Sequence, residues 1–112
     1  MVAMIFSKGD IVEFDFSPSV GHEPAGRRPA LVVSRDKFNL FTSMTLVCPI
    51  TTRANSFPLH LELPAGLETY GVVAVEQVRA FDLDARRPRL VESIDPHGPF
   101  MRDVDELIHS FI

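Results

Sequence analysis

The stretch Ile11-Val12-Glu13-Phe14-Asp15-Phe16 alternates apolar and acidic side chains. Successive side chains of a strand point to opposite faces, so this alternation predicts a half-buried strand. A loop rich in glycine and proline, Ser17–Gly26, follows, and then an apolar run, Ala30–Ser34. A strand, a loop of breaker residues and a second strand predict an antiparallel pair, on which the rest of the fold is built.

Further short strands are expected at the spacing of hairpins. Their ranges are Met44–Thr51 with an interruption at Pro49, Pro58–Leu63, Gly71–Val75 with a continuation over Val78–Leu83, and Leu90–Ile94. Arg35–Phe41 predicts one short helical turn. Pro29 is expected at a strand start or on an edge, because proline has no N–H to donate to a central ladder.

The end of the chain predicts an amphipathic helix. After the breaker cluster Asp95–Pro99, apolar residues fall at helical spacing, and Pro99 suits a first helical position. The stripe consists of Phe100, Val104, Leu107, Ile108 and Phe111. The pattern as a whole predicts a mainly β fold: a small antiparallel β-barrel with short helical turns and a C-terminal α-helix on its open end or flank.

Length and composition restrict the class of protein. The 112 residues, 46% of them hydrophobic, predict one domain over residues 1–112. The single cysteine, Cys48, excludes an internal disulfide, and its apolar neighbours predict a buried thiol. The four histidines are widely separated, so we expect neither a metal nor another cofactor. Without a membrane span or a secretory signal in the sequence, we expect a cytoplasmic protein.

The charge distribution argues for a local anion site. A net charge of −4 disfavours broad binding of nucleic acid, because phosphate contacts need clustered cations. The acidic residues concentrate in the second half of the chain. A site for an anion would therefore lie near Arg27, Arg28 and Arg53.

An ordered set of motifs resembles the MazF/PemK family of toxin endoribonucleases and covers nearly the whole chain. The motifs are Gly9-Asp10-Ile11-Val12 with Asp15-Phe16, Glu23, Gly26-Arg27-Arg28-Pro29-Ala30-Leu31-Val32-Val33-Ser34, Pro49-Ile50-Thr51-Thr52, and Glu76-Gln77-Val78-Arg79. The resemblance implies an SH3-like barrel of the CcdB/MazF/PemK type and a homodimer. It also implies metal-independent cleavage of single-stranded RNA, such as mRNA, to a 2′,3′-cyclic phosphate and a 5′-hydroxyl. A MazE-like antitoxin would neutralise the toxin with an acidic tail.

The resemblance assigns three catalytic residues. Arg28 would hold the scissile phosphate, because a guanidinium fork suits phosphoryl oxygens; its pKa above about 12 makes it a poor proton shuttle. Thr51 would add one directed hydrogen bond. Glu23 would either orient Arg28 or accept the 2′-hydroxyl proton. Each residue also has an ordinary structural interpretation: a surface ion pair, a β-branched strand residue and a solvated loop carboxylate.

Further candidates are contacts to the substrate: His22, Arg27, Thr52, Arg53, Phe57 and Gln77. Arg27 is expected to face away from Arg28 and to meet the RNA backbone, because neighbours in a strand alternate. His22 has a reference pKa near 6.5, but we assign it to substrate contact rather than to proton transfer. Phe57 is the best candidate for stacking on a base.

One position departs from the family. In the PemK/Kid-like branch an arginine, and an aspartate two residues later, precede a glutamine. Ala74 and Glu76 stand at those positions before Gln77, so the arginine is missing. This departure favours the MazF-like arrangement on Arg28 and Thr51 and leaves Glu76 a structural role.

Two alternative functions stand beside the nuclease. A CcdB-like DNA gyrase poison shares the fold, binds a protein and cleaves nothing. That relative depends on a tryptophan near its carboxy terminus, and this chain contains no tryptophan. The other alternative is an inactive SH3-like binding module.

Overall fold

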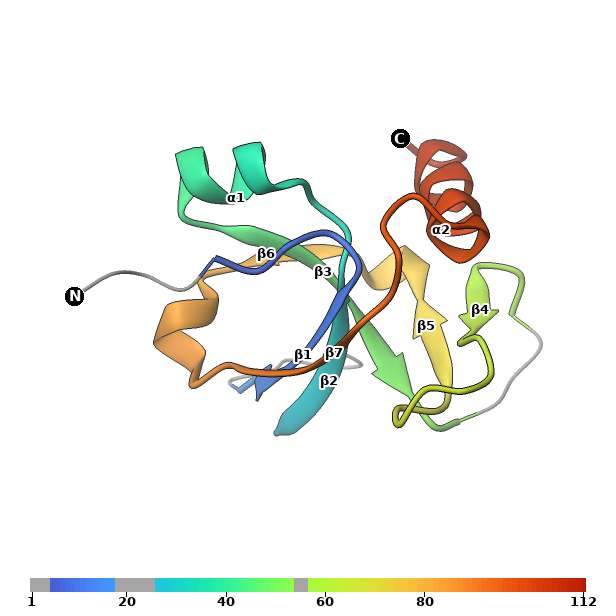
Figure 1. Cartoon of the computed structure of the whole chain (residues 1–112), viewed down its shortest axis with the longest axis horizontal. Helices are drawn as coiled ribbons and strands as arrows, with labels where there is room; N and C mark the ends of the chain where they lie inside the picture. Colours follow the sequence, from blue (N-terminus) through green and yellow to red (C-terminus); the bar gives the residue numbers. More distant parts are fainter. Residues whose placement is uncertain (1–4, 18–25, 54–56) are drawn as a thin grey trace.

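The computed structural model describes residues 5–17, 26–53 and 57–112. Strands and helices follow one another along the chain in the order shown in Figure 1. They are β1 (Asp10–Asp15), β2 (Arg27–Val32), α1 (Asp36–Thr42), β3 (Thr45–Thr51), β4 (His60–Glu62), β5 (Val72–Ala74), the 3₁₀ helix η1 (Val75–Gln77), β6 (Arg79–Phe81), the 3₁₀ helix η2 (Leu83–Arg86), β7 (Arg89–Ser93) and α2 (Pro99–His109).

The strands form one curled antiparallel sheet. Its order is β4-β5-β3-β2-β1-β7, and β6 pairs with β3 beside β5. Within the described residues no pairing joins β4 to β7, so the sheet curls like a barrel without a ladder that closes it. The predicted mainly β fold with a C-terminal helix is confirmed. In Figure 1, α1 and α2 lie along the upper side, while β2 begins and β3 ends at the lower side.

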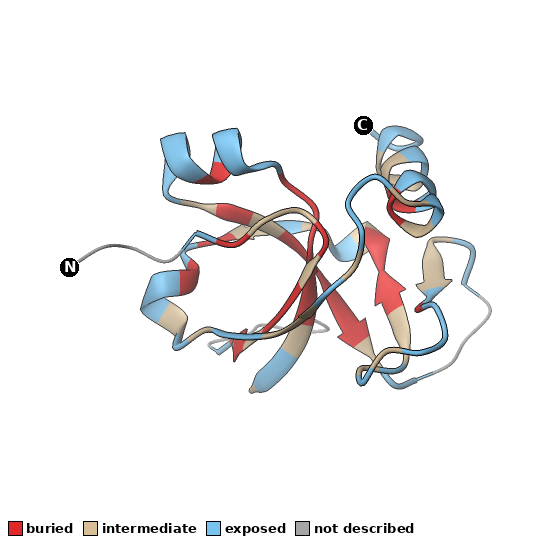
Figure 2. Ribbon diagram, viewed as in Figure 1, coloured by how far each residue is buried: buried red, intermediate tan, exposed pale blue. Residues whose placement is uncertain are grey.

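Apolar clusters occupy both faces of the central strands, which is why β2 is buried over Ala30–Val32 and β3 over most of its length (Figure 2). One cluster joins Leu31, Cys48 and Val73 to the buried face of α2 at Met101 and Val104. The other fills the inside of the curl with Phe6, Val12, Phe14, Phe16, Ala30, Val32, Val47, Phe81 and Leu83. The two faces alternate along each strand, as the period of two requires.

The C-terminal helix confirms its predicted apolar stripe but ends earlier than expected. Val104 is fully buried, while Leu107 and Ile108 pack at the margin of the core. The helix ends at His109, and Phe111 lies beyond it with 43% of its surface exposed. No helix among the described residues has the length and apolarity to cross a membrane.

Both prolines that were expected to limit strands lie inside them. Pro29 pairs with Glu13 in a strand that begins at Arg27, and Pro49 pairs with Ala30 in an unbroken β3. On its other edge β3 pairs with β6 over Thr45–Val47 and with β5 only from Ile50 onward. The missing N–H of Pro49 therefore falls where β3 changes partner, and the interruption predicted there was wrong.

Cys48 is a core residue. Its side chain is fully buried, and its Sγ lies 3.9 Å from the carbonyl oxygen of Val75. Burial, with a smaller contribution from the charge of Glu76, raises the pKa of the thiol to about 12. The predicted buried thiol is confirmed.

Glu92, on β7, fixes the turn that leads into β5. Its carboxylate accepts hydrogen bonds from the Thr69 hydroxyl at 2.6 Å and from the N–H groups of Thr69 and Glu68 at 2.7 and 3.1 Å. These bonds, the Thr69 hydroxyl first, lower the pKa of Glu92 below its ordinary 4.5. Because the folded state favours the ionised form, this stabilisation is complete above pH 4.5 and is lost as the pH falls further.

We expect Glu92→Gln to lower the free energy of unfolding at pH 7 and to lose this deficit in acid. The amide oxygen accepts fewer and weaker bonds than the carboxylate, and protonation progressively removes the wild type's advantage as the pH falls below 4.5. Urea unfolding at pH 7 and pH 3.5 measures the difference. Glu106→Gln, an exposed carboxylate on α2, is the control. An equal deficit at both pH values would contradict the assignment.

Candidate functional site

The register of β2 against β3 brings Arg28, at the start of β2, next to Thr51, at the end of β3. The two strands pair through Val32↔Val47, Leu31↔Cys48 and Ala30↔Pro49. Continuing this register by two residues sets Arg28 opposite Thr51. Both lie on the face of Ala30 and Pro49, because residues two apart in a strand share a face. An exposed guanidinium and a half-exposed hydroxyl therefore stand together where the ladder ends.

An aromatic cluster supports the Arg28 end of β2. Arg28 pairs with Phe14 across the β1–β2 ladder, and both residues lie on the same face. The Phe14 ring stacks on Phe16 with centroids 4.2 Å apart, and Phe81 meets both rings edge-on. A rigid apolar base under a strand end restricts how far that end can move.

The Thr51 hydroxyl sits at a turn. Its Oγ1 accepts a hydrogen bond from the Arg53 N–H at 3.2 Å, and an oxygen that accepts can still donate its own proton to a ligand. Thr52 and Arg53 are exposed beside it. On the other side Thr51 pairs with Val72 of β5, and the backbone of Gly71 packs directly against the Thr51 carbonyl.

Arg27 lies on the opposite face from Arg28. Its Nε donates to Glu13 Oε1 at 2.9 Å, and Arg89 Nε lies 3.7 Å from the same oxygen. These residues and Asp15 line a polar groove of about 840 Å³. The structure thus does not bring Arg27 together with Arg28 and Thr51. Its predicted contact with RNA stays a prediction.

A buried polar pair lies farther along the site face of the sheet. His60 Nε2 lies 3.0 Å from Glu76 Oε2, which ties β4 to η1 beside the exposed Gln77. The Phe57 ring meets the imidazole edge-on at 5.1 Å and is 46% exposed. Within the described residues, His60 Nδ1 and Glu76 Oε1 are buried without a hydrogen-bond partner.

From sequence we did not single out His60. The alternation over residues 58–63 placed it on a polar face with Glu62, but gave no signal of its contact with Glu76. The structural role expected for Glu76 agrees with this contact. Phe57 contacts His60, and Gln77 is next to Glu76 in η1.

Two predicted site residues, His22 and Glu23, lie outside the described residues. Of the others, the structure groups Arg28 with Thr51, Thr52 and Arg53, and places Phe57 and Gln77 beyond β5. In the part of the chain that the structure describes, no group of three His, Cys, Asp or Glu residues is arranged to hold a metal ion.

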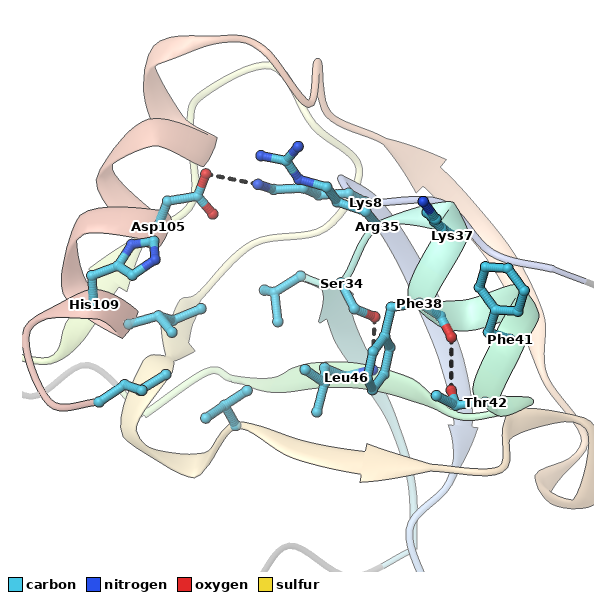
Figure 3. Close-up of a pocket in the computed structure, with 14 residues that line it drawn as sticks. Lys8, Ser34, Arg35, Lys37, Phe38, Phe41, Thr42, Leu46, Asp105 and His109 are labelled. Atoms are coloured by element: carbon cyan, nitrogen blue, oxygen red, sulfur yellow. Dashed lines mark hydrogen bonds and ion pairs between the residues drawn. The ribbon is translucent and has the colours of Figure 1, made fainter.

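A second hollow lies at the opposite end of the sheet, between α1 and α2 (Figure 3). It measures about 790 Å³ and has an apolar wall that includes Phe38, Phe41 and Leu46. Lys8 crosses to α2, where its Nζ lies 2.7 Å from Asp105 Oδ2. Neither Arg28 nor Thr51 is among the residues that line this groove between α1 and α2.

Fold and site together define a small β protein that presents an arginine and a hydroxyl, groups suited to a phosphoryl anion, at one end of a curled sheet. The chain belongs to the PemK-like, MazF-like toxins of type II toxin–antitoxin systems, whose family model matches residues 7–112.

Relatives and solved structures agree with this family. The chain is 48% identical to the endoribonuclease toxin ChpB of Escherichia coli K12 over 89 residues, which span 72% of this chain and 73% of ChpB. It is 36% identical to the endoribonuclease EndoA of Bacillus subtilis, over 94% of this chain and 92% of EndoA. The crystal structure of MazF from Deinococcus radiodurans superposes with a TM-score of 0.87 at 33% identity, covering 97% of each chain. A MazE–MazF complex from the same organism gives 0.83 at 33% identity, with 97% of this chain and 96% of that chain covered.

We expect Gly71→Ala to disturb the Thr51 end of β3. Gly71 has φ +128°, and an added Cβ would lie 2.4 Å from the Thr51 carbonyl oxygen, so the two backbones must separate. The free energy of unfolding should fall by about 2 kcal/mol or more. Urea unfolding measures the loss.

Gly66→Ala is the matched control for this clash. Gly66 also has a positive φ, of +92°, but nothing lies within 4 Å of its added Cβ. It should therefore lose only the strain of its backbone conformation, about 1 kcal/mol. Equal losses in the two variants would mean that the contact with Thr51 contributes nothing.

Proposed function

We propose that this protein is the toxin of a type II toxin–antitoxin system and acts in the cytoplasm as a metal-independent, sequence-specific endoribonuclease on single-stranded RNA, mRNA in particular. The observation that carries the proposal is that Arg28 and Thr51 lie opposite each other at the ends of β2 and β3, on one face of the sheet. Membership of the toxin family, whose relatives include proteins named as endoribonucleases, supports it.

The reaction is an internal transfer at phosphorus. The ribose 2′-oxygen bonds to the adjacent phosphorus while the bond from phosphorus to the 5′-oxygen breaks. The 2′-hydroxyl gives its proton to a base, and the leaving 5′-oxygen takes one up. The products are a 2′,3′-cyclic phosphate and a 5′-hydroxyl, so neither water nor a redox partner is consumed.

Arg28 stabilises the charge that builds on the phosphoryl oxygens, because its fixed fork offers parallel donors to two of them. Thr51 donates one hydrogen bond to the same group. Glu23 either orients Arg28 or takes the 2′-proton. Thr52 and Arg53 contact the strand of RNA next to the scissile bond, and His22 contacts it from the loop. Phe57 and Gln77 receive bases farther along the sheet, Phe57 by stacking.

Arg27 contacts the RNA backbone from the other face, through the groove that it shares with Arg89. Both arginines are held by Glu13, and a carboxylate between two cations leaves a net positive pair for a phosphate. On a protein of net charge −4, electrostatic attraction to RNA is thereby confined to the surface around Arg27 and Arg89.

A cognate antitoxin of the MazE type completes the system. A basic edge on an acidic protein suits an acidic, extended tail whose carboxylates occupy the phosphate positions. Solved structures of relatives include complexes described as MazE–MazF and as an endoribonuclease with its cognate antitoxin.

We expect the purified protein to cleave a defined single-stranded transcript in the presence of EDTA and to leave 2′,3′-cyclic phosphate and 5′-hydroxyl ends. Arg28→Ala should lower kcat/KM by about 10²–10³-fold, because one preorganised donor set is lost from the transition state. Thr51→Val should lower kcat/KM by about tenfold or more, because it removes a hydrogen bond and keeps the β-branched shape.

The controls separate chemistry from folding. Arg102→Ala removes an exposed arginine on α2 and should cleave like the wild type. Thr51→Ser keeps a hydroxyl and should recover most of the activity lost in Thr51→Val. Wild-type activity in Thr51→Val would show that only the shape of Thr51 matters. Inhibition of DNA gyrase without RNA cleavage would instead favour the CcdB-like alternative.

Self-association is expected through the groove between α1 and α2. The short helix α1 exposes Phe38, Leu40 and Phe41, with 76% of Phe41 accessible, and Ile112 adds to the same groove. Large apolar side chains concentrated on one exposed helix mark an interaction surface. A second copy suits this surface, because a domain of this size gains core by dimerising and one patch meets itself across a twofold axis.

Phe41→Glu should therefore convert the dimer to a monomer at micromolar concentration, because the dimer would bury a charge without a partner. Light scattering coupled to size exclusion measures the mass. Tyr70→Glu is the matched control, since Tyr70 is also 76% exposed but lies on the turn before β5. Dissociation by Tyr70→Glu, but not by Phe41→Glu, would place the dimer contact elsewhere.

A further inference from the structure

Arg86 connects the end of η2 to the far end of β1. Its Nη1 donates hydrogen bonds to the carbonyl oxygens of Asp15 at 3.1 Å and of Ser17 at 2.9 Å. These two residues lead from β1 into the segment that carries Glu23. A charged donor shared between two backbone carbonyls fixes their positions more strongly than a neutral one does.

The same guanidinium lies on the aromatic cluster. Its central carbon is 4.7 Å from the centroid of the Phe81 ring, and Phe81 packs against Phe14 and Phe16. Half-buried between a ring face and two carbonyls, the side chain has little freedom to take another position. It is thus a rigid connection between η2 and the β1 strand.

Arg86 acts on the stem that joins β1 to β2. In this stem the Phe16 N–H donates to the Gly26 carbonyl at 2.9 Å, and the Gly26 N–H donates to Ser17 Oγ at 3.2 Å. The Ser17 N–H in turn donates to Asp15 Oδ1 at 2.9 Å. Each of these stem hydrogen bonds therefore has at least one partner on, or next to in the chain, a residue that Arg86 binds.

Charge in the stem agrees with this arrangement. The Ser17 N–H is the largest cause of a lowered pKa at Asp15, and the nearby charges of Arg86 and Arg27 lower it further. The Asp15 carboxylate thus stays ionised and keeps accepting the Ser17 N–H at neutral pH.

Arg28 lies one residue pair from this stem. Asp15 pairs with Arg27, and Phe14 with Arg28, in the β1–β2 ladder. Any movement of Asp15 and Ser17 therefore passes directly to the strand that carries Arg28.

We propose that Arg86 is a positioning residue: by binding the Asp15 and Ser17 carbonyls it sets the end of the β1–β2 ladder and thereby the aim of Arg28. This inference rests on the proposed function of Arg28 as the group that binds the scissile phosphate. Arg86 itself need not touch RNA, and its contribution is to the reaction step rather than to substrate affinity.

The test compares Arg86→Met and Arg86→Lys with Arg102→Met. Methionine keeps the apolar contact with Phe81 but donates nothing, whereas lysine keeps a charge and donors. Arg102 is an exposed arginine on α2, outside the groove of Arg27 and Arg89, and is the matched control. With a fluorogenic single-stranded RNA, Arg86→Met should lower kcat about 10- to 100-fold and change KM less than about threefold, because a misplaced catalytic group costs rate. Arg86→Lys should recover at least part of the rate, and Arg102→Met should match the wild type within about twofold.

A mutant cycle separates positioning from general support of the fold. If Arg86 acts through Arg28, Arg86→Met should cost less than about threefold in an Arg28→Lys background, because Arg28 is already impaired. Equal costs in both backgrounds, or a KM effect larger than the kcat effect, would overturn the proposal. If Arg86→Met fails to fold, Arg86→Gln takes its place, because it loses the charge and the fork of the guanidinium. Wild-type kcat in Arg86→Gln would overturn the proposal.

A readout without catalysis keeps this inference separate from the proposed function. The Arg28 Nε–H resonance should shift in Arg86→Met and stay unchanged in Arg102→Met. A wild type that cleaves no RNA would sink the nuclease proposal while the resonance still reports on positioning. An Arg28 resonance that does not shift in Arg86→Met would overturn the positioning role, whatever the activity.

Discussion

The antiparallel pairing of β2 with β3 is the contact on which the rest of the molecule depends. It carries apolar clusters on both faces, supports α2 on one of them, and leaves the other edge of β3 free to take β5 and β6 in succession. It also sets the site, since Arg28 and Thr51 stand two residues beyond its last pair. A slip of one residue would send one of them to the opposite face of the sheet. The same register therefore builds the core and brings the two candidate site residues together.

Much of the fold was predictable, because most of its strands and helices have a recognisable local sequence pattern. The alternation around Phe14 gave β1, and the helical stripe around Val104 gave α2. The predictions were wrong at Pro29 and Pro49. The local rule that proline limits a strand was overridden there by how the strands pair. A proline is tolerated inside β3 because the strand changes partner there, and which partners a strand has on each edge is invisible in its own sequence.

The site was predictable in part. Alternation alone separates Arg28 from Arg27, and the motif match selects Thr51 over Thr52. The sequence offered no such route to the contact between His60 and Glu76, whose partners lie 16 positions apart on separate elements. Arg86 was visible only as one member of a basic turn, because the carbonyls that it binds are 69 and 71 positions away. Every residue has a backbone carbonyl. A side chain that binds such carbonyls therefore has no recognisable partner residue in the sequence.

The order of synthesis has a bearing on when this chain becomes harmful. Arg28 and Thr51 come from strands separated by α1, and β3 gains its outer partners only when residues 72–81 have been made. The helix that covers one face is the last element of all. Pairings so distant in sequence form late and cooperatively. A nascent chain that ends before residue 72 therefore lacks the outer partners of β3 and the helix α2, so the strand that carries Thr51 is not yet supported as in the folded protein.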